Sequence, residues 1–367
     1  MADELRTPLT GNTGSSFMKA CFNGTNAFLG IGLLTVPYAL SSGGWLSLVL
    51  FFLIAIMTFY TGILLKRCME ADPSIRTYLD IAGRAFGTRG RIIVSIIMNS
   101  ELYLVAIGLL ILEGDNLHKL FPKFMVKLGT LTVDGRQSFV IITALVIFPS
   151  MLLTDLSILS YVSATGVFSC LIILGSILCV GAIDGVGFHA KGSLLNLSGI
   201  PTAVSLYIVC FAGHPVIPSI YTSMRHRYQF SKVLLFSFLL TTITYMSMAI
   251  VAYLIYALMV TPVATAIEGG LSEDYKNWRP IRLLIRITLL ISTVFVAYVF
   301  PYYESLMAIV GSIFVVLGSF LIPCMCYLKI FYSYRNWSYE LMGKVGIILF
   351  GTLAGVLGTY SSIAELV

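Results

Sequence analysis

The sequence predicts an all-α protein, a polytopic bundle of membrane-spanning helices that forms a single transmembrane domain over residues 1–367. Hydrophobic residues make up 58% of the chain, whereas globular domains contain about 45–50%. Charged residues make up only 11%, against about 25% in globular domains. Long apolar runs without charge recur along the chain, and no strand-type alternation exceeds the helical pattern. This composition excludes a soluble enzyme, a disordered chain and a nucleic-acid-binding protein.

The positions of the charges divide the chain into segments of membrane length, since a helix needs about 20 apolar residues to cross a bilayer. The first charge-free run, residues 20–65, has 46 residues, enough for two spans separated by a turn at residues 41–45. A basic loop over residues 66–91 follows, and residues 113–136 form a second loop. The other predicted spans are 92–112, 137–153, 156–183, one within 195–224, 233–267, 287–303, 305–328 and 345–364.

Lysine and arginine predict the orientation, because cytosolic loops of membrane proteins carry an excess of both residues. The loop 66–91 carries six of them, which places it in the cytosol. The polar tail, residues 1–17, then lies in the cytosol as well, and it lacks the pattern of a cleavable signal peptide.

The segment 233–267 gives a contradictory result. If it crosses once, 11 basic residues lie inside and 12 outside; if it crosses twice, the numbers are 18 and 5. Two crossings need about 40 residues and a turn. The segment has 35 residues, with no Gly, Asn or Asp to make the turn. The chain therefore has 10 or 11 spans, and the sequence leaves the choice open.

The first and sixth spans contain residues that interrupt a helix. Gly32 is followed by Pro37, and Gly213 is followed by Pro218 at the same spacing. Paired interruptions in matching spans point to a transporter site. There, freed N–H groups can hold a carboxylate, and freed carbonyl groups an ammonium or a cation. The two together suit a zwitterion such as an amino acid. The alternative is a pair of packing kinks, since Gly and Pro are common in membrane helices.

Two ionisable side chains lie within predicted spans. Glu101 is near the middle of the third span, and His214 is inside the interruption of the sixth. Each is either a proton carrier or substrate contact, or a group held by hydrogen bonds for structural reasons. The seven cysteines have no metal-type spacing, so we expect them to be structural. Without a phosphate loop or a nucleophile motif, we expect no enzyme activity, no cofactor and no metal.

Several stretches resemble the amino acid/auxin permease family, in particular its vacuolar amino acid transporter branch. They occur in the family's order over nearly the whole chain. The stretches are FNGTNAFLGIGLLTVPYAL (22–40), YLDIAGRAFG (78–87), LEGDNLHKLFP (112–122), LTDLSILSYVSATG (153–166), CFAGHPVIPSIYTSMRHR (210–227) and YALMVTP (256–262).

The resemblance implies the fold of amino acid/polyamine/cation transporters, an inverted repeat of two five-helix halves with broken first and sixth spans. The halves would be residues 18–183 and 192–328, followed by a C-terminal loop and last helix over residues 329–367. The implied function is secondary active, proton-coupled transport of amino acids by alternating access. The expected location is the vacuolar membrane or another endomembrane, with the plasma membrane as the alternative. Expected partners are an amino acid, protons and the lipid bilayer.

The resemblance also implies site residues on both sides of the interruptions. The substrate would be held by Asn26, Leu29, Gly30, Ile31, Gly32, Leu33, Phe211, Ala212, Gly213 and His214. Coupling or proton transfer is assigned to Asn23, Thr25 and Glu101.

The chain departs from the family pattern around Tyr253–Tyr256. Residues 252–255 run directly into residues 256–261, which resemble the inner half of the eighth span. We therefore expect that an internal stretch is missing and that the second repeat is incomplete at 233–267. The alternative function is then a transport-deficient short form that acts as a regulator or sensor.

Overall fold

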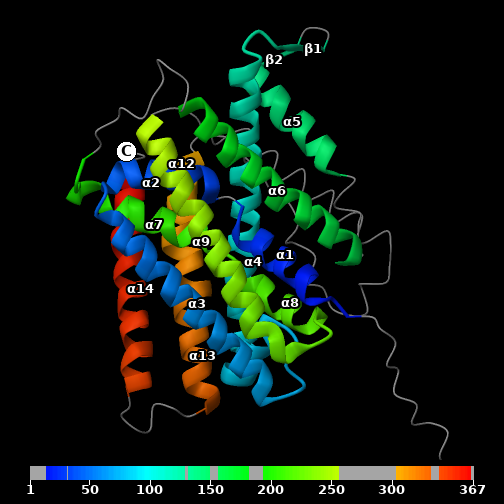
Figure 1. Ribbon diagram of the computed structural model, residues 1–367, viewed down its shortest axis with the longest axis vertical. Helices are drawn as coiled ribbons and strands as arrows, with labels where there is room; N and C mark the ends of the chain where they lie inside the picture. Colours follow the sequence, from blue (N-terminus) through cyan, green and yellow to red (C-terminus); the bar gives the residue numbers. More distant parts are fainter. Residues whose placement is uncertain are drawn as a thin grey trace, which may run out of the picture.

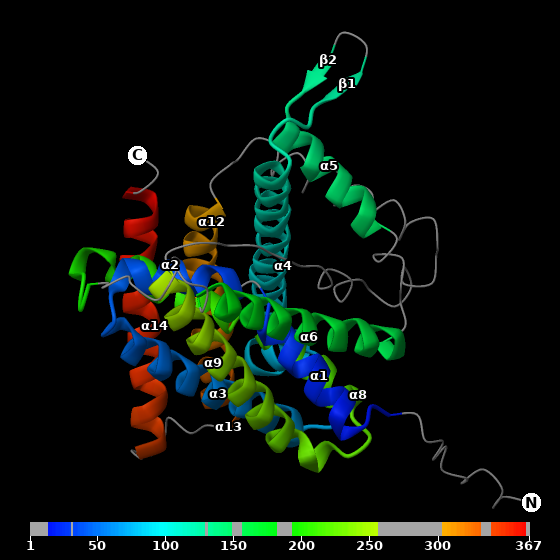
Figure 2. The ribbon, with the colours of Figure 1, turned by 45° about the horizontal axis from the view of Figure 1, so that its top comes forward.

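The computed structural model describes residues 14–30, 32–128, 131–148, 156–181, 193–255, 303–331 and 339–364. Over these ranges the chain is a helical bundle with one small β-hairpin (Figures 1 and 2). Six helical segments are long and apolar enough to cross a membrane. The prediction of an all-α polytopic membrane fold is confirmed.

The first half contains α1 (Phe17–Phe28), α2 (Gly32–Gly43), α3 (Ser47–Ala71), α4 (Tyr78–Leu120), β1 (Val126–Leu128), β2 (Leu131–Val133), α5 (Gly135–Ile147) and α6 (Leu156–Gly181). The second contains η2 (Leu197–Gly199), α7 (Ile200–Cys210), η3 (His214–Val216), α8 (Ile217–Ser223), η4 (Arg227–Gln229), α9 (Phe230–Ile255), α12 (Tyr303–Ile309), the π-helix η6 (Val310–Leu321), α13 (Ile322–Phe331) and α14 (Tyr339–Ala364).

The broken spans form the centre of the bundle and run antiparallel. At one end, Ser15 accepts from the Arg225 amide, so the start of α1 meets the end of α8. At the other end, the Asn196 amide donates to the Gly43 carbonyl, so the end of α2 meets the approach to α7. Around this pair, α2 packs on α7 and α9, and α1 packs on α6 and α9.

The basic segment 66–91 is mostly helical, which corrects the predicted loop. Helix α3 continues to Ala71, and α4 already begins at Tyr78 with a capping box between Thr77 and Asp80. The helix is interrupted at Gly87, whose φ of 69° and ψ of −165° lie in a region that is essentially restricted to glycine. The first two turns of α4 are therefore a short helix of their own, separated from the long span by Gly87.

The segment 113–136 also differs from the predicted loop. Helix α4 continues to Leu120, and the chain then forms an antiparallel hairpin in which Val126 pairs with Val133. Both figures show this hairpin at the tip of the molecule, beyond α4 and α5. Strands of three residues are too short for an alternating pattern to appear in the sequence.

Helix α9 (Phe230–Ile255) covers most of segment 233–267, for which the sequence left one or two membrane crossings open. It is one continuous helix of 26 residues, about 39 Å long and sufficient for one crossing. Residues 256–302 lie outside the described ranges, and with them the predicted span 287–303 and any second crossing.

Helix α14 is tied to the bundle by a polar cluster, which we call the Glu340 cluster. The Glu340 carboxylate lies 2.7 Å from the Arg67 guanidinium and 3.1 Å from the Lys344 ammonium. Lys344 is fully buried and lies 4.3 Å from the centre of the Tyr327 ring. The cluster therefore joins α14 to α3 and α13.

Candidate functional site

The first span is broken between Phe28 and Gly32, as predicted. The Leu29 amide still bonds to the Thr25 carbonyl, but Leu29 itself has left helical geometry with a ψ of 75°. Helix α2 resumes at Gly32. Ile31, predicted to bind substrate, lies outside the described residues. Backbone groups that an unbroken helix would pair are thus released between the two half-helices.

The sixth span is broken in the same way. Helix α7 ends at Cys210, and the residues from Phe211 to Gly213 are non-helical. A single 3₁₀ turn, η3, then leads into the short helix α8, with a proline near the start of each. Both predicted interruptions are confirmed.

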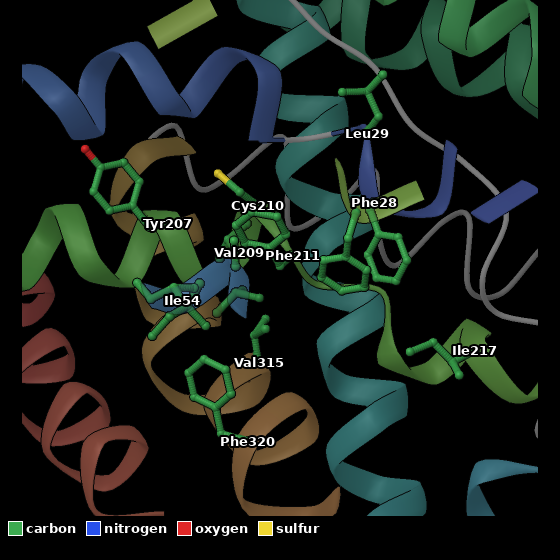
Figure 3. Close-up of a cluster of buried hydrophobic side chains, with 14 of the residues drawn as sticks. Phe28, Leu29, Ile54, Tyr207, Val209, Cys210, Phe211, Ile217, Val315 and Phe320 are labelled. Carbon is green, nitrogen blue, oxygen red and sulfur yellow. The ribbon is translucent and has the colours of Figure 1, made fainter. Parts of the chain in front are cut away.

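The two breaks lie against each other because glycine allows the backbones to approach. A Cβ at Gly32 would lie 2.7 Å from the Cys210 sulfur and 2.8 Å from the Cys210 Cα, and one at Gly213 would overlap the Phe28 ring. Figure 3 shows Phe28, Cys210 and Phe211 in the same buried cluster. The two breaks are thus in direct contact, and the role of the predicted residues in binding substrate stays a prediction.

Aromatic rings cover this site. The Phe238 ring of α9 lies 4.4 Å from the Phe28 ring and stacks on the Phe211 ring at 5.8 Å, with an angle of 8°. Leu29 and Leu33 are also buried beside the first break. The described side chains give the site an apolar lining, and its polar groups come mainly from the backbone.

Sequence reasoning missed Tyr245, which reaches the first break from α9. Its hydroxyl accepts from the Gly30 amide at 3.0 Å and donates to the Phe28 carbonyl. The Tyr245 ring is fully buried and meets the Phe211 ring edge-on. Tyr245 is one of 20 tyrosines, and it lies in a uniform apolar run where no local signal distinguishes it.

His214 is fully buried in η3 and faces α3. Its Nε2 atom lies 2.8 Å from the Thr61 hydroxyl, which in turn donates to the Thr58 carbonyl. This bond fits the structural alternative for His214, and a substrate or proton role of His214 stays a prediction. Ala212, between Phe211 and Gly213, is only partly buried.

Three polar residues of α1 precede the first break but face different ways. Asn26 lies against Gly166 of α6. Asn23 is three residues earlier and shares that face, whereas Thr25 lies nearly opposite to Asn23. Asn23 Oδ1 and Thr25 Oγ1 are buried, and neither has a hydrogen-bond partner within the described part of the chain. Asn23 and Thr25 thus lie on different sides of α1, and their role in coupling stays a prediction.

Glu101 belongs to a separate place in the bundle. It is 1% exposed on α4, and its Oε2 atom lies 2.9 Å from where a Cβ at Gly318 of η6 would stand. The Gly318 carbonyl accepts a hydrogen bond from the Tyr78 hydroxyl at 2.5 Å, and Glu101 Oε2 has no hydrogen-bond partner among the described residues. Glu101 is therefore a buried carboxyl facing the π-helix η6 rather than the broken helices.

The described residues contain neither a disulfide bond nor a candidate metal site. All seven cysteines are free thiols. Within the described residues, no three His, Cys, Asp or Glu side chains group together as a candidate metal site.

Comparisons with known proteins all lead to amino acid transporters. A family model described as "Transmembrane amino acid transporter protein" matches residues 13–267 and 254–364. "Amino acid transporter AVT1I" of Arabidopsis thaliana is 44% identical, with 97% of this chain and 96% of that protein aligned. "Amino acid transporter AVT1J" of the same plant is also 44% identical, with 97% and 92% aligned. "Amino acid transporter AVT1B" is 36% identical, with 96% and 72% aligned.

The same comparisons agree with a missing stretch. The two family matches overlap on residues 254–267, which is where the sequence predicts the join. The alignment with AVT1I covers 391 residues although this chain has 367, so the relative contains residues without a counterpart here.

Proposed function

We propose that this chain, which belongs to the transmembrane amino acid transporter family, carries neutral amino acids across a membrane by alternating access and together with protons. The observation that carries the proposal is the pair of antiparallel broken spans that meet at Gly32 and Cys210. Irregular backbone at membrane depth is tolerated where it lines a cavity, and such paired breaks hold substrates in secondary transporters.

The lining of the site supports a neutral substrate. The released Gly30 amide can bind a carboxylate, and the released Phe28 carbonyl can bind an ammonium group. The described side chains at the breaks are mostly aromatic or aliphatic, and their polar groups, which include Cys210, His214 and the Tyr245 hydroxyl, carry no carboxylate. A charged substrate side chain would lose its hydration in this lining without gaining a counter-charge.

Glu101 is the residue we propose for proton coupling. A carboxyl buried in a membrane bundle is costly unless it is protonated, and such groups commonly carry protons in transporters. Glu101 is buried and faces the π-helix η6, and one of its oxygens finds no hydrogen-bond partner in the part of the chain that the structure describes. Local π-helical geometry frequently occurs at functional sites.

The proposed location is the vacuolar membrane with the N-terminus in the cytosol. The resemblance to the vacuolar branch and the basic residues of segment 66–91 support it. The repeats would comprise residues 18–183 and 192–328.

Transport by the purified full chain in lipid vesicles tests the proposal. Uptake of radiolabelled alanine, leucine, glutamate and lysine is measured with and without an imposed pH gradient. We expect uptake of alanine or leucine, accelerated by the gradient, and much slower uptake of glutamate and lysine. Absence of uptake by correctly inserted protein would contradict transport by this chain.

A second function is favoured by one observation, the overlapping family matches at residues 254–267. A chain that lacks part of its seventh and eighth spans could bind an amino acid without moving it, and would then act as a sensor or regulator. Binding of alanine or leucine without uptake would support this second function.

The number of crossings is tested by an epitope tag at the C-terminus and protease treatment of sealed vesicles. A cytosolic tag corresponds to 10 crossings and a non-cytosolic tag to 11. A separate protein that carries the same tag at its N-terminus serves as the cytosolic reference.

A further inference from the structure

The hydroxyl group of Tyr245 occupies the backbone groups released by the first break. The Gly30 amide donates to this hydroxyl at 3.0 Å, and the hydroxyl donates to the Phe28 carbonyl. In an unbroken helix, the amide of residue 30 would bond to residue 26, and the carbonyl of residue 28 would accept from residue 32. One side chain from α9 thus satisfies two groups that the break leaves without helical partners.

Under the proposed function, a bound amino acid would make the same two contacts. A carboxylate accepts from an amide N–H, as the Tyr245 oxygen does from Gly30. An ammonium group donates to a carbonyl, as the Tyr245 hydroxyl does to Phe28. The hydroxyl of Tyr245 and the charged ends of a zwitterion therefore compete for the same backbone groups.

The surroundings allow the hydroxyl to be replaced. A Cβ at Gly30 would meet no atom of the described residues within 4 Å, so none of these residues crowds the amide. The Tyr245 ring is held more tightly, since its Cζ atom lies 2.7 Å from where a Cβ at Gly32 would stand. Because the hydroxyl oxygen is bonded to Cζ, displacement of the hydroxyl also moves the ring.

We propose that Tyr245 is a specificity-determining residue that takes the substrate's place in the empty site and must be displaced when the amino acid binds. This inference rests on the proposed function, and it deepens that function by naming a competing group within the chain. Only a ligand that offers both an acceptor for Gly30 and a donor for Phe28 replaces both lost hydrogen bonds. An amino acid with free amino and carboxyl groups meets this requirement.

Removing the hydroxyl tests the proposal. The full-length wild type, Tyr245→Phe and Tyr253→Phe are compared in equilibrium binding of radiolabelled alanine and leucine. Tyr253 is the matched control because it lies on the same helix, and its hydroxyl accepts from Ser193 instead. We expect Tyr245→Phe to bind roughly three- to tenfold more tightly, as loss of a competing hydrogen bond predicts. Tyr253→Phe should bind like the wild type.

Unchanged or weaker binding by Tyr245→Phe overturns the proposal, and weaker binding would identify Tyr245 as a direct substrate ligand. Amide hydrogen exchange without any amino acid gives an independent readout. The Gly30 amide should exchange faster in Tyr245→Phe than in the wild type, and equal exchange also overturns the proposal. If no variant binds alanine, leucine, glutamate or lysine, the proposed function fails, and the exchange result still decides whether the tyrosine bridge exists.

Discussion

Single residues of this chain are constrained most strongly where the two broken spans meet. Gly32 allows α2 to touch Cys210 and Tyr245 at the same time, and no larger residue fits between them. The constraint is one of volume, because a single methyl group would overlap atoms of both neighbours.

We expect Gly32→Ala to lower the free energy of unfolding by about 1–3 kcal/mol, as overpacking does in tight interiors, and to abolish uptake. Gly346→Ala is the control, because a Cβ at Gly346 of α14 would meet no atom of the described residues within 4 Å. Melting in detergent and uptake in vesicles measure the two effects. Normal uptake by Gly32→Ala or by Gly213→Val would mean that the breaks are packing kinks.

Glu101 permits a test of proton coupling at a single carboxyl group. Glu101→Gln keeps the shape of the side chain but cannot release a proton. We expect uptake by this variant to lose its dependence on the pH gradient while substrate binding stays within about twofold, since Glu101 faces Gly318 and not the breaks.

The control for that experiment is Glu70→Gln, which changes an exposed carboxylate paired with Lys66 near the end of α3. Uptake by this variant should respond to the gradient like the wild type. A full response to the gradient in Glu101→Gln would assign coupling to another group.

Among the helices, α4 carries a break that depends on one backbone conformation. Gly87 has a positive φ with an extended ψ, whereas Gly83, one turn earlier, is an ordinary helical residue. The two glycines are therefore a matched pair within one element.

We expect Gly87→Ala to destabilise the protein by about 1–3 kcal/mol, because alanine is strained in this conformation. Gly83→Ala should stabilise it by about 0.5–1 kcal/mol, since glycine is a poor helix former and the new Cβ makes ordinary contacts at 3.8 Å. Melting temperatures in detergent compare the variants. Equal shifts of the same sign would show that α4 is continuous through Gly87.

The Glu340 cluster determines how α14 is attached. Glu340→Gln removes the carboxylate that Arg67 and Lys344 share, and it leaves the buried Lys344 ammonium without its counter-charge. We expect a loss of about 1–2 kcal/mol in stability. Lys344→Met should cost less, because it removes the buried ammonium itself and leaves the half-exposed Glu340 carboxylate paired with Arg67. Thermal unfolding of both variants in detergent, at low and at high salt, measures the two losses of stability. A larger loss for Lys344→Met than for Glu340→Gln would contradict this account.

For the whole molecule, the completeness of the second repeat is the central question. Inserting the stretch that AVT1I contains at the join near residues 254–267 should restore a full seventh and eighth span. If the missing stretch limits transport, we expect the extended chain to take up alanine or leucine faster than the original chain at equal protein content. Equal uptake would show that the short form is complete in function.

The sequence predicted the helical membrane fold and both interruptions because these depend on local signals, namely charge-free length and the spacing of Gly and Pro. Tyr245 could not be predicted, since its partners Phe28 and Gly30 lie more than 200 residues away in the chain. Glu101 was recognised as buried, but its neighbour Gly318 leaves no sequence signal. The inverted repeat and the roles of the site residues remain predictions.

The backbone bonds at the two ends of the broken spans have a mechanical consequence. Ser15 fastens the start of the first span to the end of the sixth, and Gly43 fastens the other two ends through Asn196. Backbone hydrogen bonds thus connect the four half-helices at both ends of the two broken spans. In the alternating access that we propose, these bonds favour movement of the four half-helices together, relative to the helices around them.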